Sequence, residues 1–98
     1  MATGKELAGL DIKVFSAAWC PDCRRLDAWM VREGLDFPKV DIEADPDAAD
    51  RLERETGKRA IPFVLVNGKA WVRGYHKELP TRFDPALFVR EVVEAASK

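Results

Sequence analysis

Cys20 and Cys23 are the only cysteines of the 98-residue chain, and two residues separate them. The alternating apolar and polar residues at 12–16 predict a strand just before them, and the residues from Pro21 onward show helical spacing. Proline suits the first helical position because its missing N–H has no partner to lose there. The pattern therefore predicts a strand-to-helix corner, with Cys20 at the helix start and Cys23 nearly one turn further on.

This corner suits thiol chemistry. The first N–H groups of a helix lack partners and carry the positive end of its dipole, which stabilises a thiolate and lowers the pKa of a thiol placed there. Two sulfurs three residues apart on a helix can also approach disulfide distance. Arg24 and Arg25 add positive charge while Asp22 opposes them, so charge alone leaves the size of the effect open.

The spacing also limits the alternatives. A structural zinc site needs four ligands, and besides the cysteines only His76 remains, so a zinc finger within a monomer is excluded. A redox pair is the favoured interpretation. A metal or cluster shared across a dimer, or a structural cysteine pair, are the alternatives.

Composition predicts a single domain over residues 1–98. With 16 basic and 17 acidic residues, the net charge of −1 predicts neither a nucleic acid nor a membrane surface as partner. No apolar run is long enough to span a bilayer, and residues 1–6 lack the apolar core of a signal peptide. We therefore expect a cytoplasmic protein, monomeric and without a bound cofactor, in which a cysteine pair is more often catalytic than structural.

The ends of helices and strands are predicted mainly from helix-capping and turn residues. Asp45-Pro46 and Asp84-Pro85 each predict a helix N-cap followed by proline, and Asn67-Gly68 predicts a two-residue hairpin turn. Residues 1–10 are expected to be frayed or loosely helical. Strands are expected at 12–16, 37–42, 63–66 and 69–73, and helices at 21–33, 46–56 and from 85 onward. This order predicts an α/β chain of the type β-α-β-α-β-β-α, with a four-stranded mixed sheet sandwiched by three helices.

The order of elements and the cysteine corner resemble the thioredoxin fold, and within it the glutaredoxin family, over roughly residues 11–97. Cys20-Pro21-Asp22-Cys23 is similar to the Cys-Pro-aromatic-Cys motif of dithiol glutaredoxins, and Ala60-Ile61-Pro62 is similar to their Thr-Val-Pro. The resemblance implies a thiol–disulfide oxidoreductase in which Cys20 attacks and Cys23 resolves. It also implies that Pro62 is cis and faces the nucleophile, and that the backbone of Ile61 pairs with the substrate as an added strand.

Several positions depart from that family. Trp19 looks more like thioredoxin, whereas Val14 stands where thioredoxins carry a buried aspartate. Glutaredoxins have a Gly-Gly pair followed by acidic residues after the last strand, which holds glutathione; residues 73–76 here are Arg-Gly-Tyr-His. Glutathione is therefore one candidate reductant, and a thioredoxin-reductase-type flavoprotein is the other, with disulfide-containing proteins as substrates. Residues 75–83 also look longer than the usual link to the last helix.

The candidate catalytic residues are Cys20 and Cys23, and no metal ligands are expected. Cys23 is expected to be the less accessible thiol, and His76 to be a loop residue without a role. A competing interpretation is an iron–sulfur carrier or a binding adaptor without redox turnover, although cluster-carrying glutaredoxins typically present Cys-Gly-Phe-Ser instead. The candidate substrate-binding residues flank the two motifs and the last strand: Trp19, Pro21, Asp22, Arg24, Ile61, Pro62, Gly74 and Tyr75.

Overall fold

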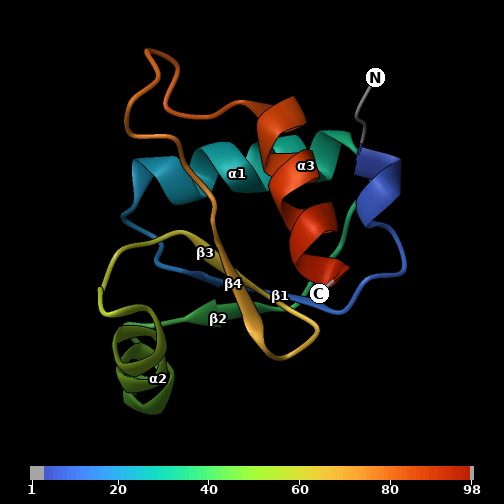
Figure 1. The fold of residues 1–98 in the computed structure, drawn as a ribbon. Helices are drawn as coiled ribbons and strands as arrows, with labels where there is room; N and C mark the ends of the chain where they lie inside the picture. The colour runs from blue at the N-terminus through green and yellow to red at the C-terminus, as the bar shows by residue number, and fades with distance from the viewer. Residues whose placement is uncertain (1–3, 98) are drawn as a thin grey trace.

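A four-stranded sheet organises the computed structural model, which describes residues 4–97 (Figure 1). Its strands lie in the order β2-β1-β3-β4. β1 and β2 run parallel, while β1 with β3 and β3 with β4 run antiparallel. The strands are β1 (Ile12–Ser16), β2 (Lys39–Asp41), β3 (Phe63–Val66) and β4 (Ala70–Arg73). The predicted fold class and order of elements are confirmed.

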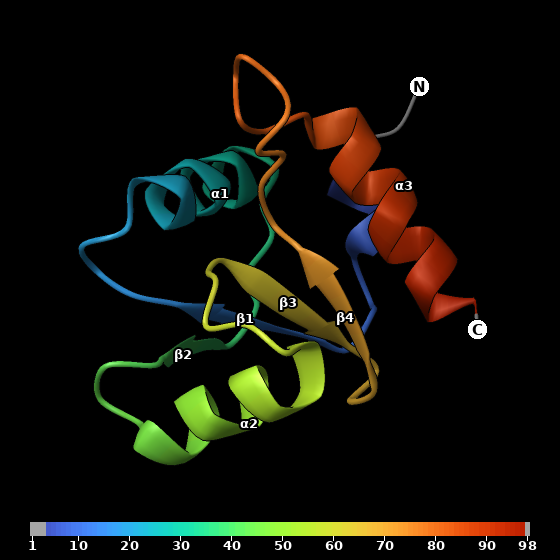
Figure 2. The same cartoon turned by 60° about the vertical axis from the view of Figure 1, so that its left-hand side comes forward.

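Three helices cover the sheet. α1 (Pro21–Arg32) and α3 (Pro85–Ala96) lie on one face, and α2 (Pro46–Thr56) lies on the other (Figures 1 and 2). The Asp45 and Asp84 side chains accept hydrogen bonds from backbone N–H groups of the first turn, and a proline follows each. Gly57 ends α2 in the left-handed region, at a φ of 79°. Local capping chemistry therefore fixes these helix ends as the sequence predicts.

The strand β3 is buried on both faces, as its continuous apolar run predicts. Val64 and Val66 belong to the core beneath α1 and α3, and Phe63 and Leu65 belong to the core on the other side. The period of two in a strand places alternate residues in the two cores. The second core also contains both cysteines, so the sheet and the redox motif share one packed layer.

Residues Gly4–Leu7 form a short 3-10 helix whose Leu7 is fully buried, so this part of the N-terminal segment takes the helical form of the two that were expected. Residues 1–3 lie outside the described part. The chain departs from the predicted elements at two places. The turn after β3 takes three residues, because Val66 pairs with Ala70. The strand β2 begins only at Lys39, after Pro38, and it is an edge strand.

The segment between β4 and α3, residues 74–84, loops out beside α1 (Figure 2). Its last part is anchored by Phe83, which precedes the N-cap of α3 and packs on Phe88 four residues into that helix, with ring centroids 5.7 Å apart. This arrangement is a hydrophobic staple. Among the described residues, no helix is long and apolar enough to cross a membrane.

Candidate active site

Cys20 is the N-cap of α1. Its backbone is extended (φ −85°, ψ 115°), and its Sγ accepts a hydrogen bond from the N–H of Cys23 at 3.2 Å. An N-cap side chain satisfies one of the unpaired N–H groups of the first turn, and the same donor stabilises negative charge on a sulfur. The predicted placement of Cys20 at a helix start, with Pro21 at the first helical position, is confirmed.

Cys23 is held as a thiol. Burial raises its pKa from 9.0 to about 12, and a hydrogen bond with Cys20 adds to that effect, as does the negative charge of Asp22. Cys23 therefore keeps its proton at neutral pH. Both cysteines are free in this structure.

The expected difference in accessibility between the two thiols is wrong. Cys20 is 4% exposed and Cys23 is 6% exposed. The physical reason is that both sulfurs belong to the core that α2 covers, together with Phe63 and Leu65. Exposure therefore does not distinguish the two thiols, whereas their positions on the helix and the raised pKa of Cys23 do.

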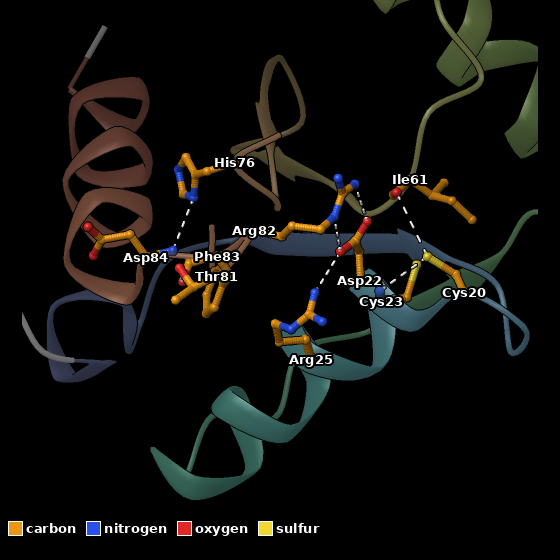
Figure 3. Close-up of polar contacts among 10 residues, drawn as sticks. All are labelled: Cys20, Asp22, Cys23, Arg25, Ile61, His76, Thr81, Arg82, Phe83 and Asp84. Carbon is orange, nitrogen blue, oxygen red and sulfur yellow. Dashed lines mark hydrogen bonds and ion pairs between the residues drawn. The ribbon is translucent and has the colours of Figure 1, made fainter. Parts of the chain in front are cut away.

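The Ile61–Pro62 peptide bond is cis, and the Cys20 thiol points at the carbonyl oxygen of Ile61, with 3.9 Å between sulfur and oxygen (Figure 3). The predicted cis proline therefore faces the first cysteine. Gly74 closes this corner: its N–H donates to the Pro62 carbonyl at 2.9 Å. A Cβ on Gly74 would lie 2.9 Å from Leu26 Cδ2, so close packing by itself explains a glycine here.

Asp22 is held by two arginines. Arg25, one turn along α1, places Nη1 2.7 Å from Oδ1 of Asp22. Arg82, from the loop before α3, grips the same carboxylate with Nε at 3.0 Å and Nη2 at 2.8 Å (Figure 3). The hydrogen bond from Arg82 is the largest influence that lowers the pKa of Asp22 below 3.8. Sequence reasoning missed Arg82, which lies 60 residues from its partner.

The remaining predicted residues lie around this centre. Trp19 is 60% exposed, and its indole N–H donates to Glu43 at 2.5 Å. The Arg24 guanidinium donates to the carbonyl of Ala18 at 3.2 Å instead of reaching a thiol. Tyr75 is half-buried, with the guanidinium groups of Arg73 and Arg82 over its ring.

His76 has a structural role that the sequence did not predict. His76 is 4% exposed; its Nδ1 accepts from the N–H of Asp84 at 3.2 Å, and its Nε2 lies 3.0 Å from Glu91 Oε1. Since Nδ1 accepts from a backbone donor, the proton lies on Nε2 and is donated to Glu91. A histidine with both ring nitrogens bonded fixes the loop to α3. Nothing in the sequence around His76 marks it as buried.

A pocket of about 280 Å³ lies behind the motif, lined by Cys23, Asp27 and Lys39 among others. Asp27 follows Cys23 by four residues on α1, so both side chains lie on one face of the helix. Its Oδ1 is shielded from solvent and is ion-paired with the ammonium group of Lys39. The i, i+4 spacing was visible in the sequence, but the approach of β2 was needed to show that a charged pair lies near the second thiol.

Within residues 4–97, no group of three or more His, Cys, Asp or Glu side chains is arranged to hold a metal ion.

Comparison with known proteins agrees with this geometry. The family model described as glutaredoxin matches residues 12–71. A glutaredoxin of Pseudomonas aeruginosa is 29% identical over 64% of this chain and 74% of its own length. The glutaredoxin-like protein NrdH of Salmonella typhimurium is 29% identical over 78% of this chain and 91% of its own length.

Among solved structures, the glutaredoxin of Archaeoglobus fulgidus superimposes with a TM-score of 0.57, over 80% of this chain and 89% of its own, at 22% identity. That likeness supports the thioredoxin fold. The family match spans the first three strands and the redox corner. The chain therefore belongs to the glutaredoxin family and is a glutaredoxin-like thiol–disulfide oxidoreductase.

Proposed function

We propose that the protein reduces disulfides of other proteins through the Cys20–Cys23 dithiol and is itself recharged by a thioredoxin-reductase-type flavoprotein. The observation that carries the dithiol route is the asymmetry of the two sulfurs. Cys20 Sγ accepts a helix N–H, while burial and Cys20 hold the proton on Cys23.

The reaction takes two steps. The Cys20 thiolate attacks one sulfur of the substrate disulfide, which forms a mixed disulfide and expels the other sulfur as a thiolate that takes up a proton. Cys23 then loses its proton and attacks Cys20 Sγ. That step forms the Cys20–Cys23 disulfide and releases the second substrate thiol, so two electrons pass to the substrate. In this route the backbone of Ile61, beside the cis proline and next to Cys20 Sγ, pairs with the backbone of an extended substrate.

The choice of electron donor depends on the residues after β4. The glutathione-holding pattern of the family needs a second glycine and acidic residues there, but Tyr75, His76 and Lys77 follow Gly74. The His76 side chain is buried against α3, and Gly74 is packed against Leu26 and Pro62. A protein donor needs a contact surface instead, and the exposed Trp19 beside Cys20 supplies apolar area for one.

A coupled assay tests both parts. The protein is offered a disulfide-containing protein together with NADPH and thioredoxin reductase, or with NADPH, glutathione and glutathione reductase. We expect turnover with the first system and at most slow turnover with the second. Cys20→Ser should abolish turnover, whereas Cys23→Ser should accumulate a mixed disulfide. Equal or faster turnover with glutathione would refute the donor, and thiol reactivity surviving in Cys20→Ser but lost in Cys23→Ser would reverse the roles.

A further inference from the structure

The carboxylate of Asp22 lies within the redox motif, on the second residue of α1 and between the two cysteines. Its side chain is only 16% exposed. A negative charge at this place opposes the formation of a thiolate beside it, since like charges repel strongly where solvent is partly excluded. An attacking Cys20 therefore needs something that cancels this charge.

Two guanidinium groups provide the compensation, and they are not equivalent. Arg25 makes a single contact from the same helix, and its side chain is 43% exposed, as is that of Arg82. Arg82 makes a bidentate contact with both carboxylate oxygens, the geometry in which arginine binds carboxylates most strongly.

The loop of residues 74–84 holds Arg82 in place. Arg82 has a φ of +58°, in the left-handed region that side chains other than glycine rarely adopt. Two backbone hydrogen bonds hold it: its N–H donates to Leu79 at 3.0 Å, and its carbonyl accepts from His76 at 2.6 Å. His76 is in turn bonded to Asp84 and Glu91 at α3. Strained backbone that is held by several contacts is typical of functional sites.

We propose that Arg82 is a positioning residue of the redox site, which holds Asp22 and cancels its repulsion of the Cys20 thiolate, so that the loop of residues 74–84 sets the reactivity of the dithiol. This inference rests on the proposed role of Cys20 as the attacking thiolate. Arg25 provides a matched comparison, because it contacts the same carboxylate through a single bond and its side chain is as exposed as that of Arg82. The Arg24 guanidinium donates to the Ala18 carbonyl instead of to Asp22.

The test measures alkylation of Cys20 by iodoacetamide as a function of pH in a Cys23→Ser background, where Cys20 is the only thiol. We expect Arg82→Gln to move the midpoint of the profile to higher pH by about one unit, which is about tenfold slower alkylation below the midpoint. Arg25→Gln should move it much less. Asp22→Asn added to Arg82→Gln should restore fast alkylation, because the uncompensated carboxylate is gone.

Rescue by Asp22→Asn separates electrostatics from folding, since a loop that has merely lost its anchor would not regain function when its partner is also removed. An unshifted profile in Arg82→Gln, an equal shift in Arg25→Gln, or a double variant as slow as Arg82→Gln would each overturn the proposal. Failure of the proposed function looks different: the parent protein would then be inactive in the coupled assay, whatever residue 82 is.

Discussion

Replacing Gly74 by alanine tests whether this glycine serves packing or a ligand. The added Cβ would lie 2.9 Å from Leu26 Cδ2, 3.1 Å from Pro62 Cγ and 3.3 Å from the Pro62 carbonyl oxygen. Leu26 is 1% exposed, and Pro62 is fully buried, so neither has free space to move into. Because the φ of Gly74 lies outside the left-handed region, the substitution is governed by contacts and not by backbone strain.

The magnitude follows from two opposing effects. Alanine lowers the entropy of the unfolded chain, which stabilises the protein by about 0.4–1 kcal/mol. Overpacking of a filled core costs about 1–3 kcal/mol. We expect the free energy of unfolding to fall by about 1–2 kcal/mol, and the Tm to fall by about 4–8 °C for each kcal/mol in a domain of this size.

Urea unfolding of Gly74→Ala in the wild-type and Leu26→Val backgrounds measures this. Valine has no Cδ atoms, so the closest contact disappears, and Gly74→Ala should cost less in that background. A Gly74→Ala protein as stable as wild type would refute the packing argument. If that stable variant also lost activity with glutathione alone, a ligand-binding role for Gly74 would replace it.

Three further outcomes follow from the charges of the site. Because Arg82 lowers the pKa of Asp22 below 3.8, their ion pair stabilises the protein fully above pH 3.8, and this stabilisation is lost as the pH falls through the lowered pKa. The difference in urea midpoint between wild type and Asp22→Asn should therefore vanish in acid. Because burial raises the pKa of Cys23 from 9.0 to about 12, the reduced protein should lose stability as the pH rises above 9.0. Cys23→Ser should lack this loss. A Cys23→Ser protein whose stability falls equally steeply with alkaline pH would contradict the argument. Asp27 is paired with Lys39 in the pocket behind the motif, where it can accept the Cys23 proton. Asp27→Asn should then slow release of the reduced substrate at least about tenfold without slowing the first attack. Rapid-quench trapping of the mixed disulfide measures both steps.

The elements that the sequence predicts well are those whose causes are local. Proline after Asp45 and after Asp84, and the left-handed glycine at position 57, act on residues within one helical turn. The alternation of β3 needs only the period of a strand. The Cys20 corner belongs to this class too, because a helix start, a proline and a three-residue spacing are sufficient to place both sulfurs.

Burial of short segments was predicted less well, because it depends on which distant element covers them. Leu7 is fully buried only because the lead-in packs against α3. Cys20 is as buried as Cys23 because both sulfurs face the core that α2 completes. In each case the sequence identifies an apolar residue, and the tertiary contact decides how much of it reaches solvent.

The charge balance of the motif is the clearest case of a property that local sequence cannot give. The Asp22 carboxylate of Cys-Pro-Asp-Cys opposes formation of a thiolate beside it, and the neighbouring Arg25 offsets this charge through a single contact only. The stronger partner, Arg82, lies 60 residues away on a loop, in a backbone conformation that nothing in its sequence favours. The residues between the cysteines therefore act together with the loop before the last helix, and a change in that loop should alter the dithiol without touching the motif.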